Sequence, residues 1–172
     1  KKRRKSNPPA PFNTTSLMAA ASSIGIKPAR TMRIAESLYM NGYTSYPRVD
    51  NTVYPDNLDL REVLGILAKV PDFREGAEEL LAKNKLTATR GKQETTDHPP
   101  IYPTGAADPD KLRPEEWKLY SLICRRFMAT LSEAAVLEST KVTLDVAGEA
   151  FTARGDVLVE PGYRSVYPYG LK

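Results

Sequence analysis

The chain has 172 residues, of which 41% are hydrophobic and 27% are charged, and it contains a single cysteine, Cys124. This size and composition predict a globular protein with a buried core, and the cysteine count excludes an internal disulfide and a zinc site built from several cysteines. No apolar run approaches the roughly 20 residues of a membrane helix and no apolar signal core follows the basic N-terminus, so we expect a cytoplasmic protein without a membrane partner.

Residues 1–5 are all lysine or arginine and account for the net charge of +4. Such a run either adds salt-dependent affinity for a phosphate backbone or is a solvated linker. Three prolines follow within residues 8–11 and exclude a helix there. We therefore interpret residues 1–11 as a basic, proline-rich linker.

Residues 12–135 are expected to form a helical domain. Candidate caps at residues 13–15 precede a helix over 16–24, and Pro28 opens a second helix over 28–41. Two short helices with a glycine-containing connection predict a helix-turn-helix pair with winged-helix-like character. In the second helix Ile34, Ala35, Leu38 and Tyr39 are expected to face the core. Lys27, Arg30 and Arg33 gather near its start, where they form either a solvated basic face or an anion-binding one.

Residues 42–51 are extended in character and rich in groups that act on phosphate. Tyr46, Arg48 and Asp50 alternate with a period of two, so an extended backbone places them on one face. The tyrosine hydroxyl could attack phosphorus, the guanidinium fits phosphate oxygens, and the carboxylate could orient the arginine or move a proton. The alternative is a half-buried tyrosine beside an ordinary surface ion pair.

Helices over 58–69 and 73–83 and a polar loop over 84–97 follow, and then a rigid segment with three prolines over 97–104. That segment contains His98, the chain's only histidine, which by itself cannot make a metal site. A helix over 112–131 has an inward aromatic stripe. From residue 136 onwards, alternation and glycines predict short strands over 139–146, 151–154, 157–159 and 163–167. The fold class is therefore mainly α with a smaller β part.

The segment Ser-Tyr-Pro-Arg-Val-Asp-Asn (45–51) and the segment His-Pro-Pro-Ile-Tyr-Pro-Thr (98–104) together resemble the two hallmark motifs of the type IA DNA topoisomerases. The chain departs from the family pattern in Val49, where threonine is usual, and in Asn51, where serine is common. The resemblance implies a central fragment of such an enzyme, with residues 136–172 beginning its β-rich arch domain. The proline-rich forms of both motifs look closer to topoisomerase III and archaeal-type enzymes than to bacterial topoisomerase I.

The resemblance also assigns roles to individual residues. Tyr46 would form a 5′-phosphotyrosyl bond, and Arg48 and His98 would act on the scissile phosphate with Asp50 in support. Residues Arg30, Thr31, Arg33 and Thr104 would contact single-stranded DNA. The reaction would require no ATP, and the location would be cytoplasmic and nucleoid-associated.

Magnesium is expected in the full-length enzyme, but the acidic Asp-x-Asp-x-Glu signature of the family is absent here, since Asp108-Pro-Asp110 lacks the glutamate. We therefore expect no metal ligands in this chain, a dependence on the remaining domains of the parent chain, and no relaxation of DNA by the fragment alone. Two alternatives predict different behaviour. A nonenzymatic winged-helix-like module would bind nucleic acid without using Tyr46, and a structural or protein-interaction domain would not bind oligonucleotides at all.

Overall fold

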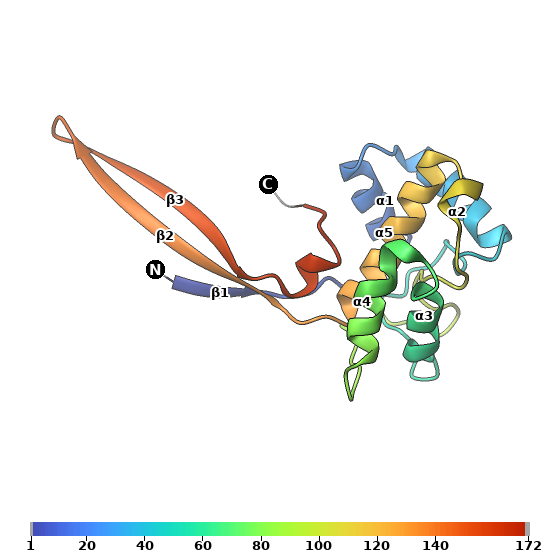
Figure 1. Ribbon diagram of the computed structural model, residues 1–172. Coiled ribbons are helices and arrows are strands. Elements are labelled where there is room, and N and C mark those ends of the chain that lie inside the picture. The colour runs from blue at the N-terminus through green and yellow to red at the C-terminus, as the bar shows by residue number, and fades with distance from the viewer. Residues whose placement is uncertain (1, 171–172) are drawn as a thin grey trace.

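The computed structural model describes residues 2–170 and consists of a helical body and a long β-hairpin that extends away from it (Figure 1). The body contains α1 (Thr14–Ser23), α2 (Pro28–Met40), α3 (Leu60–Leu67), α4 (Pro71–Leu81), the short 3-10 turn η1 (Pro109–Lys111) and α5 (Pro114–Thr130). The sheet contains β1 (Lys2–Ser6), β2 (Ala135–Val146) and β3 (Glu149–Glu160), and the 3-10 turn η2 (Gly162–Ser165) follows it. The prediction of a mainly helical fold with a smaller β part is confirmed.

The N-terminal ends of the first helices are set by local sequence signals. Asn13 caps α1: its side chain accepts a hydrogen bond from the backbone N–H of Ser16 at 2.9 Å, and the Ser16 hydroxyl accepts one from the Asn13 N–H at 3.0 Å. The helix therefore begins two residues before the predicted start. Pro28 opens α2 as predicted, and Gly42, at φ 78°, follows its end.

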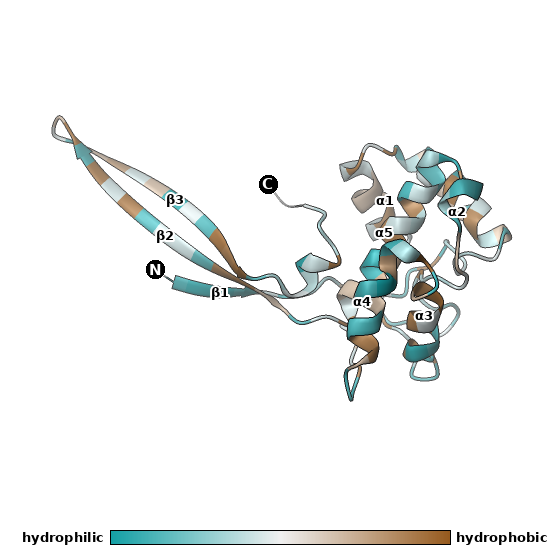
Figure 2. Ribbon diagram, in the orientation of Figure 1, coloured by the Kyte–Doolittle hydropathy of each residue, from teal (hydrophilic) through white to brown (hydrophobic). Residues whose placement is uncertain are grey.

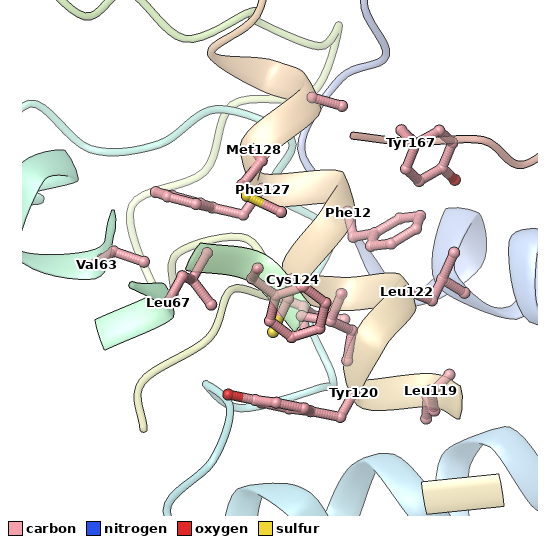
Figure 3. Close-up of a cluster of buried hydrophobic side chains, with 14 of the residues drawn as sticks. Phe12, Val63, Leu67, Leu119, Tyr120, Leu122, Cys124, Phe127, Met128 and Tyr167 are labelled. Carbon is pink, nitrogen blue, oxygen red and sulfur yellow. The ribbon is translucent and has the colours of Figure 1, made fainter. Parts of the chain in front are cut away.

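Helix α5 is the centre of the core. Phe127, Met128 and Cys124 on this helix pack between Phe12 on one side and Leu67 of α3 on the other (Figure 3). A fully buried side chain of this size stabilises the fold by about 1.5–3 kcal/mol. Cys124 is buried as predicted, and burial raises the pKa of its thiol. The buried members of α5 are Leu119, Tyr120, Leu122, Ile123, Cys124, Phe127, Met128, Ala129 and Thr130.

The winged-helix-like character predicted for the first two helices is not confirmed. Helices α1 and α2 do contact each other. The sheet formed by residues 2–160, however, has the order β1-β2-β3 and lies on the opposite side of the molecule from these two helices (Figure 1). A wing packed beside the helix pair is therefore not present among residues 2–170.

The basic N-terminal segment is a strand and not a linker. Residues 2–6 pair antiparallel with β2, from Lys2 opposite Ser139 to Ser6 opposite Ala135. Arg3 and Arg4 also form ion pairs with Glu138 and Asp156 at 3.4 and 3.2 Å. Lysine and arginine are well suited to an edge strand because their charge opposes further strand pairing.

The hairpin is longer and more regular than the sequence predicted. The two strands expected over 151–154 and 157–159 are one continuous strand, β3, because Gly155 stays paired with Thr140 and does not end the ladder. The turn between β2 and β3 consists of Ala147 and Gly148, which both have positive φ angles of 54° and 83°. This is the backbone of a tight two-residue hairpin turn.

The strand predicted over 163–167 is instead the turn η2. Pro161 cannot donate to a ladder, and the backbone N–H of Tyr163 donates to the Glu133 carbonyl at 2.8 Å, which redirects the chain towards α5. Val166 and Tyr167 then pack into the helical core. The apolar residues that suggested a strand over 163–167 are therefore explained by the packing of Val166 and Tyr167 against the helical body. None of the helices formed by residues 2–170 has the length and apolarity that crossing a bilayer requires.

Candidate active site

The two motifs singled out in the sequence lie side by side in the structure. The backbone of Ser45 donates to the carbonyl of Tyr102 at 2.9 Å, and the N–H of Thr104 donates to the carbonyl of Tyr43 at 2.9 Å. The buried Ser45 hydroxyl accepts from the Tyr102 N–H at 2.9 Å and donates to the Pro100 carbonyl at 3.2 Å. These bonds hold the tyrosine segment and the histidine segment, more than 50 residues apart in sequence, in one fixed register.

The tyrosine segment has the two-sided character that its sequence period predicted. Tyr46 is half-buried, and Arg48 and Asp50 are exposed. The alternate residues of the segment, Ser45, Pro47 and Val49, are buried and face the interior. The side chains of Tyr46, Arg48 and Asp50 therefore share the outer face of an extended segment.

The ring of Tyr46 contacts two other rings. Its centroid is 5.0 Å from that of His98 and 5.3 Å from that of Tyr39, which meets it edge-on. His98 itself is exposed. Tyr39 was predicted to face the core, and this prediction is wrong: 41% of its surface is exposed, and it flanks Tyr46. The phenol at position 46 thus has two aromatic neighbours, one of which is an imidazole.

Arg48 is held by a residue that the sequence reading did not consider. Its Nε and Nη2 atoms both donate to Oε1 of Glu36 on α2, at 2.8 and 2.6 Å. Asp50, which the sequence suggested as the group that orients this arginine, contributes its backbone carbonyl to a bond from the Asn13 side chain at 3.3 Å. Both members of the Arg48–Glu36 pair are about half exposed, so a phosphate could compete for the guanidinium.

Asn51 anchors the loop that carries His98. This side chain is only 3% exposed. Its Nδ2 donates to the backbone carbonyls of Thr95 and His98 at 3.0 and 3.1 Å, and its Oδ1 accepts from the N–H of Val53 at 2.9 Å. Buried amide bonds of this kind fix a loop because breaking them leaves unpaired polar groups.

A pocket of about 560 Å³ opens beside the histidine segment. His98, Asn51 and Tyr102 contribute to its wall, but Tyr46 does not. The phenol of Tyr46 is therefore not part of this pocket. Its remaining lining residues are Val53, Pro55, Asn57, Leu58, Glu94, Thr95, Thr96, Asp97 and Pro99.

The residues expected to contact DNA fall into three environments. Arg33 is exposed, and the Nε of Arg30 donates to Glu115 Oε2 of α5 at 2.6 Å in an exposed ion pair. Thr104 is exposed, but its hydroxyl donates to the Gly42 carbonyl at 3.0 Å. Thr31 is fully buried and its hydroxyl donates to the Ile26 carbonyl at 3.4 Å. A side chain in that position supports α2 from within and does not present a surface to a ligand.

The described part of the chain, residues 2–170, contains no group of three or more histidine, cysteine, aspartate or glutamate side chains placed to hold a metal ion. Asp108, one of the two aspartates considered in the sequence, caps η1 by accepting from the Asp110 N–H at 2.9 Å. The acidic side chains on this part of the chain therefore offer no candidate metal centre.

All 172 residues match the sequence profile of a family described as DNA topoisomerase. The chain belongs to the type IA DNA topoisomerases. The expectation drawn from the two motifs is thereby confirmed for the whole length of this topoisomerase chain.

Relatives of this topoisomerase chain include archaeal and eukaryotic proteins. DNA topoisomerase 1 of Archaeoglobus fulgidus is 48% identical over 169 residues, which cover 98% of this chain and 25% of that protein. DNA topoisomerase 3-beta-1 of Mus musculus is 35% identical over 162 residues, covering 94% of this chain and 19% of that protein. The structure resembles full-length topoisomerase I from Thermotoga maritima, with a TM-score of 0.67 and 26% identity, over 99% of this chain and 29% of that one.

The topoisomerase chain thus spans about a quarter of the length of the first of these relatives. Tyr46, Arg48 and His98 were singled out from the sequence, whereas Glu36 was not, and neither the contact of Tyr39 with Tyr46 nor the hydrogen bonds of Asn51 were predicted. The one signal in the sequence was that asparagine stands at position 51, where the family commonly has serine. The contacts of Glu36 and Tyr39 depend on how α2 packs against residues 46–48, which no local pattern encodes.

Proposed function

We propose that this chain is the nucleophile-bearing segment of an enzyme that cuts and rejoins one strand of DNA. The observation that carries the proposal is the position of Tyr46, whose ring lies 5.0 Å from His98 on the face that also presents Arg48. A hydroxyl nucleophile, an imidazole and a guanidinium on one surface are the groups that phosphoryl transfer to a side chain needs.

The proposed reaction is a transesterification at phosphorus. The Tyr46 oxygen forms a bond to phosphorus while the bond to the 3′ oxygen of the neighbouring nucleotide breaks. The phenol gives up its proton and the departing 3′ oxygen gains one, so the products are a 5′-phosphotyrosyl bond and a free 3′-hydroxyl. Reversal by that hydroxyl rejoins the strand after another strand has passed. The number of phosphoester bonds is unchanged, which is why the reaction needs no ATP.

In this proposal Arg48 and His98 act directly on the scissile phosphate. The guanidinium of Arg48 would leave Glu36, at least in part, and bind the phosphate oxygens on which charge develops. His98 would bind the same phosphate or transfer a proton, and an imidazole can do both near neutral pH. Asp50 is exposed on the same face and would support this proton traffic.

The strand to be cut would be single-stranded DNA that reaches Tyr46 along the start of α2. Arg33 is exposed there, and Arg30 could exchange its surface ion pair with Glu115 for a backbone phosphate. Thr104 is exposed, and because its hydroxyl donates to the Gly42 carbonyl, its oxygen could contact DNA by accepting a hydrogen bond from a base N–H. Thr31 contributes by supporting α2 from the interior and not by direct contact.

The rest of the enzyme would come from other domains of a longer chain. Relatives such as the Archaeoglobus fulgidus protein are about four times the length of the matching segment, given that it covers 25% of them. Magnesium would be held by those other domains. We further propose that residues 12–135 are the tyrosine-bearing domain, that residues 136–172 begin an arch domain, and that the enzyme works on nucleoid DNA in the cytoplasm.

The test is relaxation of supercoiled plasmid by a complete enzyme that carries this sequence. Tyr46→Phe should abolish relaxation, and Arg48→Ala should reduce it about 100-fold or more, as expected for a group that stabilises transition-state charge. Tyr39→Phe is the matched control because it removes a hydroxyl from the neighbouring ring and should leave relaxation within a few-fold.

Two results would contradict the proposal. Undiminished relaxation by Tyr46→Phe would mean that Tyr46 is not the nucleophile and would favour a module that only binds nucleic acid. Efficient relaxation by the isolated 172-residue chain would show that the chain does not need other domains.

A further inference from the structure

The first residue of α1 is bonded to the backbone of the segment that carries Tyr46. Thr14 follows the cap residue Asn13, and its backbone N–H is one of those at a helix start that have no partner within the helix. This N–H donates to the carbonyl of Val49 at 3.0 Å. The side chain of Asn13 adds a bond to the carbonyl of Asp50 at 3.3 Å. The start of α1 therefore holds the residues that follow Tyr46.

The hydroxyl of Thr14 bonds to both peptide groups that flank Arg48. It donates to the carbonyl of Pro47 at 2.6 Å and accepts from the N–H of Val49 at 2.9 Å. The carbonyl belongs to the peptide unit before the Cα of Arg48, and the N–H belongs to the unit after it. Because peptide units are planar, holding both of them restrains the two backbone dihedral angles of Arg48. One hydroxyl thereby sets the direction in which the arginine side chain leaves the backbone.

The guanidinium of Arg48 is held less firmly than its backbone. Its bonds to Oε1 of Glu36 belong to an ion pair in which the two side chains are 58% and 45% exposed. Exposed ion pairs contribute little to stability, and in the proposed reaction a phosphate takes the place of Glu36. The bonds of Thr14 do not involve the arginine side chain, so they persist through this exchange.

We propose that Thr14 is a positioning residue for the cleavage reaction, because its hydroxyl keeps the guanidinium of Arg48 in reach of the same phosphate after it leaves Glu36. This inference rests on the role of Arg48 in the proposed function and adds a residue outside the two motifs. Thr14 acts through the backbone of Arg48 and needs no contact with DNA. Misplacing a group by about 1 Å can cost about 100-fold in rate, so loss of the hydroxyl should slow the reaction without weakening the binding of DNA.

The next residue in the helix provides a matched control. Thr15 is exposed, and its hydroxyl makes no hydrogen bond within residues 2–170. Thr14→Val and Thr15→Val make the same chemical change at adjacent positions of one helix, so a difference between them reports the bonds of Thr14 and not helix propensity. Thr14→Ser keeps the hydroxyl and should therefore preserve the positioning.

The experiment measures how fast a complete enzyme that carries this sequence becomes covalently attached to end-labelled single-stranded DNA, with magnesium present and the enzyme in excess at several concentrations. Thr14→Val should lower the maximal rate about tenfold or more. It should leave the enzyme concentration that gives half of this rate within about twofold, because the hydroxyl does not contact DNA. Thr14→Ser and Thr15→Val should both keep a maximal rate within about twofold of the unaltered enzyme.

A double substitution distinguishes positioning of Arg48 from a general loosening of the fold. Arg48→Ala alone should lower the maximal rate about 100-fold. Adding Thr14→Val to Arg48→Ala should lower it by less than about twofold more, because no guanidinium remains to be positioned. Independent effects of the two substitutions would instead multiply.

Three results would overturn the proposal. They are a normal rate in Thr14→Val, an equal loss in Thr15→Val or Thr14→Ser, and a full tenfold loss when Thr14→Val is added to Arg48→Ala. Circular dichroism confirms that each variant is folded. A normal rate in Thr14→Val beside a slow Arg48→Ala contradicts this inference alone, whereas a normal rate in Arg48→Ala contradicts the proposed function as well, so the two failures are distinguishable.

Discussion

The helical body and the β2–β3 hairpin use apolar side chains in opposite ways. Phe127 in α5 is completely buried among neighbours from several elements, whereas Phe151 in β3 is 53% exposed and Val157 is 62% exposed. The body therefore contains the interactions that stabilise it, and these include the buried bonds of Ser45 and Asn51 that fix the two motifs. The hairpin is held by its own ladder and by β1, and its exposed apolar side chains, which appear brown along β2 and β3 in Figure 2, have no cover among residues 2–170. The candidate site is therefore built on the part of the chain that has a packed core.

The largest expected effect is the difference in the free energy of unfolding between a phenylalanine-to-alanine substitution in the helical body and one in the hairpin. Phe127→Ala should lower the free energy of unfolding by about 3–5 kcal/mol, because it leaves a cavity in the core. Phe151→Ala should change it by less than about 0.5 kcal/mol, because the side chain is at the surface. Urea denaturation followed by circular dichroism measures both. Similar losses would mean that the hairpin is part of the same cooperative core.

Asn51→Ala should loosen the histidine segment without unfolding the body. The substitution removes three buried hydrogen bonds and leaves their partners unpaired, a change of about 1–3 kcal/mol for each unsatisfied group. Hydrogen exchange of the backbone over residues 94–101 should accelerate strongly, and exchange in α5 should not. Asn57→Ala, an exposed neighbour, is the control. Unchanged exchange over 94–101 in Asn51→Ala would show that the loop is held by other contacts.

Alkaline pH should destabilise the body and spare the hairpin. Burial raises the pKa values of Cys124, Tyr54 and Tyr120. Such groups stay protonated in the folded chain but lose protons in the unfolded chain above pH values of about 8.5 for cysteine and 10 for tyrosine. The free energy of unfolding is therefore unaffected by these groups below the pKa values of the unfolded chain. Above them it falls as the pH rises, by about 1.4 kcal/mol per pH unit for each group.

Thermal unfolding from pH 7 to 11 measures this dependence. Cys124→Ala should remove the part of the decline that begins at the lowest pH and leave the tyrosine part. A melting temperature that stays constant up to pH 11 would contradict the burial of these groups.

The smallest effect on stability is expected at the Arg48–Glu36 pair. Glu36→Gln should change the free energy of unfolding by less than about 0.5 kcal/mol, since exposed ion pairs contribute little. It should tighten binding of a short single-stranded oligonucleotide by a few-fold, because Arg48 no longer has to leave a carboxylate. Glu133→Gln breaks the exposed pair with Lys83 at the same change of charge and should leave the affinity unchanged. Equal effects from the two substitutions would argue against a specific role for Glu36.

The features predicted correctly from the sequence are those that depend on local signals. Pro28 marks the start of α2, and the period of two at residues 46–50 correctly predicted which side chains face outwards. That His98 lies beside Tyr46 followed only from the family resemblance, because nothing local relates two segments about 50 residues apart. The strand β1 was missed because five consecutive basic residues resemble a linker, and their pairing partner begins about 130 residues later.

The supporting contacts of the site could not be predicted for the same reason. Tyr39 occupies a position in α2 that the helical period assigns to the core, and only the packing of α2 against the tyrosine segment places it beside Tyr46. Thr31 shows the reverse case, since it lies in a basic stretch but is turned inwards. The packing of α2 against the rest of the body determines the orientation of both side chains, and a single sequence does not reveal that packing.

The most direct test of the central claim is the identity of the residue that becomes covalently attached to DNA. A complete enzyme carrying this sequence is mixed with end-labelled single-stranded DNA and magnesium, denatured, digested with protease and analysed by mass spectrometry. We predict one adduct, a 5′-phosphate on the oxygen of Tyr46, which disappears in Tyr46→Phe and persists in Tyr39→Phe. An adduct on any other residue, or one that survives in Tyr46→Phe, would contradict it.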